Sequence, residues 1–297
     1  MSVERCAGRV AGFLVCGLAA AGASAQVPDI LIKLDVRAHY LSERGGSSTV
    51  RLYDALGNSS HVRLTAILET GFQAVLVERL SRFPNDPGGD LLEEAYIEDV
   101  GYWRLGRQFL PFGQSRTLRE NAMGAQVETT LGEDYLPLRI AWADEGKGRQ
   151  QGLIGRLGTR FGISFAVGDG FGISPTSLVN LRGIGESPGR GRGYSTVVGL
   201  DASRRIGTVD LEAEFVAFRS GATLLDEDRD VLDAQIVVRP DPSRMLILGW
   251  CRDWRRSVDE YRIVGEFQVS DNVWLVPMLR ARNSTLRDAG FGLRVRL

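Results

Sequence analysis

The sequence predicts an all-β protein, a transmembrane antiparallel up-and-down β-barrel of about 16 strands. Three observations lead to this fold class: apolar and polar residues alternate with a period of two, most alternating segments are near nine residues long, and their connections are alternately long and short. Side chains alternate across a strand, and about 9–11 residues take a tilted strand through a bilayer. Bacterial membrane barrels have short turns on one rim and longer loops on the other.

The composition excludes three other classes. The chain has 297 residues, of which 43% are hydrophobic and 25% charged, and its net charge is -1. This balance is unlike that of disordered chains or nucleic-acid-binding proteins. No apolar run of 18 or more residues exists outside the N-terminus, so a bundle of membrane helices is also excluded.

Residues 1–25 form a predicted signal peptide. Arg5 and Arg9 precede an apolar stretch, and the sequence Ala23-Ser24-Ala25 predicts cleavage before Gln26. A buried N-terminal helix is the alternative explanation of the same stretch. The predicted mature domain, residues 26–297, is then the barrel.

The mature chain offers little material for catalysis or metal binding. Cys251 is the one cysteine left after cleavage, and His39 and His61 are the two histidines. Cysteine-based metal sites are therefore excluded, and histidine-based metal sites and Ser-His-Asp triads have few candidates. We expect no enzyme activity, no metal and no cofactor.

The first strand sets the pattern for the rest. Over 32–40 the apolar residues alternate with Lys33, Asp35, Arg37 and His39, which gives one apolar and one polar face. The predicted strands, in chain order, are 32–40, 61–69, 72–80, 92–99, 102–109, 122–130, 135–143, 151–158, 161–168, 194–202, 207–218, 231–238, 245–253, 260–268, 273–282 and 289–297.

The connections assign the two rims. Short turns are predicted at 70–71, 100–101, 131–134, 159–160, 203–206, 239–244 and near Asn272, and long loops at 41–60, 81–91, 110–121, 169–193 and 219–230. An even strand number places both termini on the periplasmic rim. In hydrocarbon every backbone N–H and C=O needs a partner, so the first and last strands must pair to remove the open edge.

The polar face is predicted to line a water-filled lumen. A barrel of sixteen strands is wide enough for an aqueous passage. Period alone does not distinguish a wet lumen from a wet exterior, so the signal peptide and the loop pattern decide between them.

One stretch resembles a known family. Leu92-Glu93-Glu94-Ala95-Tyr96-Ile97, followed by Trp103-Arg104-Leu105-Gly106-Arg107-Gln108-Phe109-Leu110-Pro111-Phe112-Gly113, is similar to the strand-turn-strand pattern of Gram-negative outer-membrane porins. The resemblance implies a trimeric or monomeric water-filled channel for small solutes. One departure is Leu297, since such barrels usually end in an aromatic residue that the assembly machinery reads.

The candidate pore-lining residues form two groups. Closure of the barrel gathers a basic seam, which consists of Lys33, Arg37, Arg280, Arg282, Arg294 and Arg296, with Asp35 as a local counterion. An acidic wall, expected roughly across the lumen, consists of Asp210, Glu212, Glu214 and Asp233. A transverse field that favours anions is one interpretation, and salt-bridged charges that merely solvate the lumen are the other.

Two loops are candidates for narrowing the pore. Residues 110–121 carry Arg116, Arg119 and Glu120 in the position of the third outer loop, which porins often fold inward. The sequence favours the inward course slightly for 110–121. For the glycine-rich loop 169–193 it leaves open whether the segment enters the lumen or is exposed.

The predicted function is therefore a porin-like passive channel for small hydrophilic solutes across the outer membrane, with a preference for anions. Expected partners are outer-membrane lipid and small hydrophilic solutes, with a homotrimer as one assembly and no nucleic acid. The alternatives are a structural or adhesion barrel that transports nothing and, less favoured, an outer-membrane hydrolase. A hydrolase would need a serine or threonine beside a histidine on the lipid face, whereas His39 and His61 fall in the lumen-facing register.

Overall fold

The computed structural model describes residues 28–43, 48–52, 58–68, 71–81, 91–132, 135–145, 150–171, 194–220 and 228–297. The predicted signal peptide and its cleavage site lie outside these residues, as does 172–193 of the predicted long loop. All regular structure in the described ranges is β-strand. No helix there has the length and apolarity needed to cross a membrane.

Seventeen strands follow one another along the chain. They are β1 (Asp29–Glu43), β2 (Ser48–Arg51), β3 (His61–Ile67), β4 (Phe72–Arg79), β5 (Leu92–Asp99), β6 (Trp103–Phe109), β7 (Asn121–Leu131), β8 (Leu136–Asp144), β9 (Gln151–Gly158), β10 (Phe161–Asp169), β11 (Tyr194–Ile206), β12 (Val209–Ser220), β13 (Arg229–Asp241), β14 (Arg244–Asp253), β15 (Val258–Ser270), β16 (Val273–Arg282) and β17 (Thr285–Arg296).

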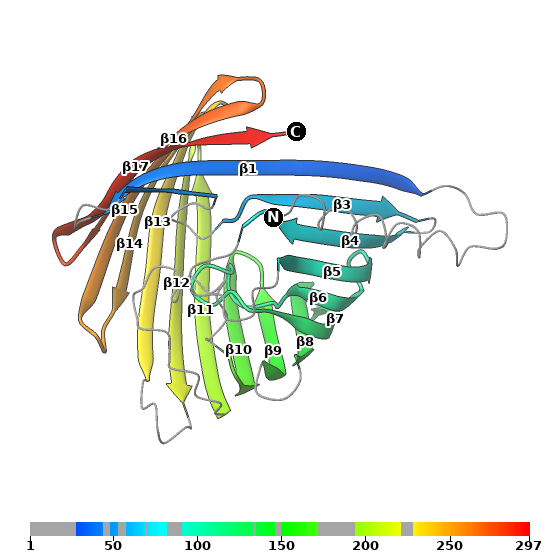
Figure 1. The fold of residues 1–297 in the computed structure, drawn as a ribbon. Helices are drawn as coiled ribbons and strands as arrows, with labels where there is room; N and C mark the ends of the chain where they lie inside the picture. The colour runs from blue at the N-terminus through cyan, green and yellow to red at the C-terminus, as the bar shows by residue number, and fades with distance from the viewer. Residues whose placement is uncertain are drawn as a thin grey trace.

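These strands form a closed antiparallel barrel of 16 strands. From β3 onward each strand pairs with the next, and β1 pairs with both β3 and β17 (Figure 1). The closing pair of strands runs from Asp35 opposite Arg296 to Glu43 opposite Asp288. Leu34 and Leu297 then exchange two backbone hydrogen bonds of 2.9 and 3.0 Å, so the ladder reaches the last residue of the chain. The predicted fold class and its closure are confirmed.

Strand β2 is an addition to the prediction, because it lies inside the expected 41–60 loop. It pairs with the outer end of β1, where Tyr40 faces Val50, whereas β3 pairs with β1 only over 29–35. Ser60 fills the gap between them: its hydroxyl accepts from the Arg37 N–H at 2.8 Å and donates to the Arg37 C=O at 3.0 Å. A side chain thus satisfies both backbone groups where no strand does.

Two predicted turns are in the wrong place. Residues 203–206 belong to β11, where Ser203 to Ile206 pair with β12 from Glu212 back to Val209, and the turn is Gly207-Thr208. Strand β13 likewise continues to Asp241 and turns at 242–243. The strands continue because their backbones still have a partner across the hairpin, whatever the local side chains suggest.

The outward face is apolar and exposed, as the alternation predicts. Ile32 on β1 and Phe161 on β10 expose 66% and 76% of their surface. The inward register carries most of the charged strand residues, but it is not wholly polar. Two apolar clusters lie on it: one gathers Leu41, Val237, Ile247, Val264, Val276 and Met278, and the other packs beneath the segment that joins β6 to β7.

Candidate functional site: an inward loop and its charged surroundings

The chain between β6 and β7 crosses the inside of the barrel. This inward loop, residues 110–120, leaves the wall at β6 and makes hydrogen bonds to β10, β12 and β13. Six strands separate β6 from β13 around the ring of sixteen, and the loop lies inside the barrel beside this part of the wall (Figure 1). Of the two courses considered for 110–121, the structure therefore shows the one that folds into the barrel.

A single carboxylate holds the middle of the inward loop. Glu214 of β12 is fully buried and accepts three backbone N–H groups: Gln114 at 2.8 Å and Arg116 at 3.3 Å on one oxygen, and Thr117 at 3.1 Å on the other. Hydrogen bonds to an ionised acceptor are stronger than neutral ones. The backbone of the loop is thus folded around an anion supplied by the wall.

Arg116 attaches the tip of the inward loop to two strands. Its guanidinium donates to Glu212 of β12 at 2.7 Å and also bonds Asp233 of β13. Asp233 in turn pairs with Arg262 of β15 at 2.8 Å. With 8% of its surface exposed, Arg116 is an anchor of the loop rather than a free charge in the passage.

Apolar contacts hold the underside of the inward loop. Phe112 is buried against Gly199 of β11, where an added Cβ would lie 2.7 Å from the phenyl ring. Gly113 has φ +50°, and a Cβ there would come within 2.6 Å of the Glu214 carboxyl group. The cluster beneath the loop consists of Leu110, Phe112, Leu118, Ala122, Ala141, Ala143, Ile154, Ala166, Phe171, Val197 and Val216. The Pro-Phe-Gly of the sequence is therefore the part of the loop that meets the wall.

The other two predicted constriction residues are engaged as well. Arg119 stacks its guanidinium 4.2 Å from the centre of the Phe109 ring, and its side chain is half-buried. Glu120 is fully buried, accepts from the Gln150 amide at 3.0 Å, and its carbonyl accepts the Leu110 N–H. Of the predicted loop residues, Arg119 is thus the one whose side chain is only half-buried.

The basic seam meets carboxylates at its centre. Arg294 of β17 donates to Asp35 of β1 at 3.0 Å and to Glu266 of β15 at 2.9 Å, and Arg37 donates to the same Asp35 at 3.2 Å. Three strands are therefore joined across the closure by one ionic cluster. Arg296 reaches Glu266 at 3.5 Å.

The outer part of the seam is paired in the same way. Arg280 donates to Asp288 at 3.0 Å, and Glu260 lies 3.6 Å from Arg282 and 3.8 Å from Arg280. Lys33, near the opposite rim, is exposed and has no ion pair among the described residues. In the part of the chain that the structure describes, the carboxylates that pair with the seam arginines include Asp35, Glu260, Glu266 and Asp288.

The acidic wall lies beside the seam rather than across from it. Its strands β12 and β13 are separated from β17 only by β14, β15 and β16. Its charges are also compensated, because Asp210 bonds Arg239 and lies 3.7 Å from Arg205, while Glu212 and Asp233 hold Arg116. The expected placement across the lumen is wrong, since closure puts β8 to β10 opposite the seam.

Sequence reasoning did not single out Glu260, Glu266 or Asp288. All three lie on the inward register, as do the seam arginines of their own or adjacent strands. This shared register is the sequence feature that could have identified them as partners of the seam. The role of Glu214 as an acceptor for a loop one hundred residues away left no local signal.

The described residues contain no group of three or more histidine, cysteine, aspartate or glutamate side chains that could hold a metal ion. His39 and His61 lie on the inward register of β1 and β3. His39 is buried, and the His61 Nδ1 lies 3.1 Å from the Ser59 carbonyl oxygen.

A scan against protein-family models and a search of curated proteins each find no match. Solved structures of Gram-negative outer-membrane porins do share the fold. A loop-deletion mutant of OmpT, an outer membrane protein of Vibrio cholerae, matches with a TM-score of 0.62 and 9% identity over 92% of this chain and 100% of that chain. The outer membrane channel DcaP of Acinetobacter baumannii gives 0.59 and 11% over 91% and 97%. The anion-selective porin from Comamonas acidovorans gives 0.56 and 13% over 90% and 98%.

Proposed function

We propose that this chain is an outer-membrane channel through which small hydrophilic solutes diffuse passively. The observation that carries the proposal is the inward loop, which is fixed to the far wall by Glu214 and Arg116 and narrows a barrel of sixteen strands. A barrel of this size has room for water, and a fixed loop sets its narrowest section. The porin fold of the neighbouring structures supports the same function.

We infer a modest preference for anions. The basic seam consists of six cations, whereas the acidic wall is matched by Arg116, Arg205, Arg239 and Arg262. We therefore expect the anion preference to arise at the seam. Most of these charges have an opposite charge close by. The electric field that acts on a passing ion is therefore weaker than it would be if the basic and acidic residues lay on opposite walls.

The proposed location is the outer membrane, reached after cleavage of residues 1–25 before Gln26. The apolar outward register meets lipid, and both described ends of the chain lie in strands that pair with each other at the closure. The short-turn rim then faces the periplasm. A homotrimer is the assembly we propose, since one neighbouring structure is described as a trimer form.

Conductance in a planar lipid bilayer tests the channel. Folded protein is added to one side, and single-channel currents are recorded in potassium chloride at several concentrations. Stepwise, voltage-independent conductance that rises with salt concentration is expected. Correctly folded protein that inserts without conductance would contradict the channel and favour a structural or adhesion barrel.

The hydrolase alternative is tested separately. Detergent-folded protein is incubated with ester and peptide substrates, and product release is measured. We expect no turnover, because both histidines lie inward and the acidic residues beside the inward loop are occupied in ion pairs or loop hydrogen bonds. Turnover that His39→Ala or His61→Ala abolishes would overturn the assignment.

A further inference from the structure

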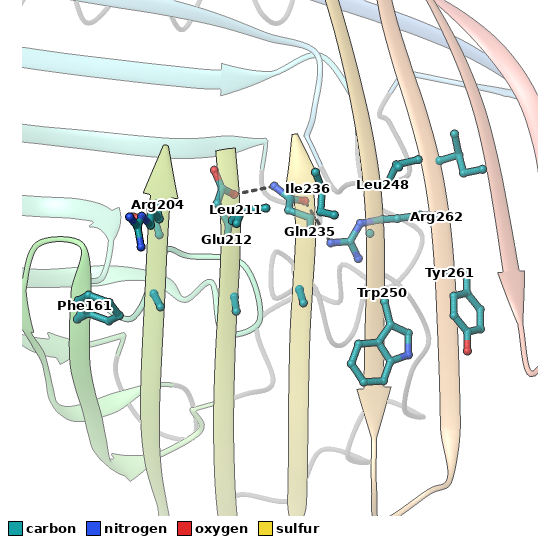
Figure 2. Close-up of a pocket in the computed structure, with 16 residues that line it drawn as sticks. Phe161, Arg204, Leu211, Glu212, Gln235, Ile236, Leu248, Trp250, Tyr261 and Arg262 are labelled. Carbon is teal, nitrogen blue, oxygen red and sulfur yellow. Dashed lines mark hydrogen bonds between the residues drawn. The ribbon is translucent and has the colours of Figure 1, made fainter. Parts of the chain in front are cut away.

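A shallow groove of about 610 Å³ crosses β10 to β15, and most of the residues that line it belong to the apolar outward register, although Glu212, Gln235 and Arg262 of the inward register also border it. It follows one row of directly paired residues, Phe161, Ala202, Ala213, Ala234, Trp250 and Tyr261. Figure 2 shows Phe161 at one end of the groove and Trp250 and Tyr261 at the other. The volume falls in the range of roughly 300–1,000 Å³ typical of sites for small organic ligands.

Side-chain size creates the groove. Three consecutive strands carry alanine in the row, while the outward residues two positions away are large: Leu200, Phe215 and Leu232 on one side, and Leu211, Ile236 and Leu248 on the other. Outward neighbours on one strand are roughly 6.8 Å apart, so the trough is about one hydrocarbon chain wide.

The groove is long and runs obliquely. Five inter-strand steps separate Phe161 from Tyr261, a length of roughly 24 Å. Phe161 directly follows the turn residue Arg160 on the short-turn rim, whereas Tyr261 lies ten residues before Asp271 of the same rim. The trough therefore climbs from that rim through more than one leaflet, which is about half of a hydrocarbon core roughly 30 Å thick.

A cation lies at the low end of the groove. Arg204 of β11 is exposed, belongs to the outward register, and lies one row closer to the rim than Ala202 (Figure 2). It has no ion pair or hydrogen bond from its side chain among the described residues. Other outward arginines differ, since Arg244 pairs with Asp241 at 3.5 Å and Arg252 with Asp259 at 2.8 Å.

At the other end of the groove, near Trp250 and Tyr261, the charged side chains are already paired. The Trp250 indole N–H donates to Asp259 at 3.0 Å, and Asp259 also accepts from Arg252. No positive charge is left over there. The groove is therefore asymmetric, with an available cation at the rim and an apolar channel that leads away from it.

We propose that this groove binds one glycerophospholipid of the periplasmic leaflet, with its phosphate on Arg204 and one acyl chain along Ala202, Ala213 and Ala234. The exposed guanidinium complements the phosphate at headgroup level. The trough matches the width of a single chain, whereas the convex wall of a second barrel would bridge over it. The site does not depend on whether the lumen conducts solutes.

Native mass spectrometry of the full chain, folded in lipid-free detergent micelles, tests the site. Dioleoyl phosphatidylglycerol, dioleoylglycerol and inorganic phosphate are titrated in separate arms. One phosphatidylglycerol per chain is expected, bound about tenfold more tightly than the phosphate-free lipid, as one charge-assisted hydrogen bond would give. Inorganic phosphate alone is expected not to bind, and binding of phosphate without lipid would overturn the acyl-chain contribution.

Two variants with matched controls locate the lipid. Ala213→Trp fills the trough and should weaken retention at least about tenfold, as loss of an apolar site does. Ala74→Trp adds the same bulk to the outward face of β4 and should have no effect. Arg204→Gln should remove the preference for phosphatidylglycerol over dioleoylglycerol, while Arg244→Gln should retain it.

Equal retention by Ala213→Trp and Ala74→Trp would show that the lipid is unspecific and overturn the proposal. Dimers that form without lipid, and that dissociate in Ala213→Trp but not in Ala74→Trp, would also overturn the proposal, because a second copy of the chain would then occupy the groove. Heat-modifiable gel mobility reports folding. If Ala213→Trp fails to fold, Ala234→Leu takes its place, with the same expected loss of retention and the same consequence if none occurs.

Discussion

At the residue scale, the inward loop depends on a few side chains that match one another in size and charge. Gly113 has a positive φ and lies against the Glu214 carboxyl group, while Phe112 occupies the space that Gly199 leaves on β11. A side chain at either glycine would collide with its partner. The Pro-Phe-Gly motif is thus explained by what it contacts on the opposite wall.

Replacing Glu214 by glutamine should loosen the inward loop. The amide keeps the size of the side chain but offers one acceptor oxygen where three N–H groups now share two. Each hydrogen bond to a charged group is worth roughly 1.5–3 kcal/mol, so the loop should detach part of the time. Single-channel recordings should show larger and noisier conductance than the wild type.

Glu128→Gln is the control for that variant, because Glu128 is an inward carboxylate near the short-turn rim that pairs with Arg139 and does not contact the loop. Its conductance should stay close to that of the wild type. Unchanged conductance in Glu214→Gln would mean that the loop does not set the narrowest section.

Ser60 makes a second prediction at this scale. Ser60→Ala removes the one group that pairs with both backbone atoms of Arg37, and a buried unpaired polar group costs about 1–3 kcal/mol. The unfolding midpoint in urea should be lower than that of the control Ser42→Ala, in which an exposed serine of β1, the strand of Arg37, is replaced. Equal midpoints would show that water replaces the hydroxyl at no cost.

At the scale of the element, β1 is the strand on which closure depends. Its first half pairs with β3 and its second half with β17 and β2, so no single neighbour covers its length. The ionic cluster of Asp35, Arg37, Arg294 and Glu266 lies where the two halves meet. The alternation over 32–40 predicted the strand and its faces, but it contains no information about which partner each half takes.

Removing Leu297 should weaken the closure. The deletion takes away both backbone hydrogen bonds to Leu34, at 2.9 and 3.0 Å, and leaves two polar groups of β1 without a strand partner. Refolding yield and the urea midpoint, followed by heat-modifiable gel mobility, should both fall. Leu297→Phe keeps the backbone bonds and should fold like the wild type; an equal loss in the two variants would place the effect in the side chain.

At the scale of the whole molecule, the charge pattern follows from the order of strands around the ring. Only β14 and β15 separate the wall strands β12 and β13 from the seam strand β16, and Arg262 of β15 pairs with Asp233 of the wall. We therefore expect the field across the lumen to depend on the charges of the seam rather than on two opposed walls.

Removing one seam cation should lower the preference for anions. Arg294→Ala and Arg280→Ala each take one positive charge from the seam and leave carboxylates less compensated. In a salt gradient, the reversal potential should shift toward cation selectivity. The shift should be larger near 0.1 M than near 1 M salt, because the screening length falls from about 10 Å to about 3 Å.

Arg244→Ala is the control, since Arg244 is an outward residue on the rim of β14. Its reversal potential should match that of the wild type. No shift in either seam variant would reject the seam as the source of selectivity.

The sequence by itself determined the fold class, the inward and outward registers and most strand positions, because alternation with a period of two is a local property of the chain. Only the tertiary structure decided the partners of β1, the neighbouring positions of the seam and the wall, and the role of Glu214. It also placed apolar clusters on the inward face, one of them beneath the loop that crosses the lumen. These features depend on contacts between residues far apart in the sequence, such as Arg294 and Asp35, which are 259 positions apart. Such contacts exist only once the barrel closes, so no local pattern encodes them.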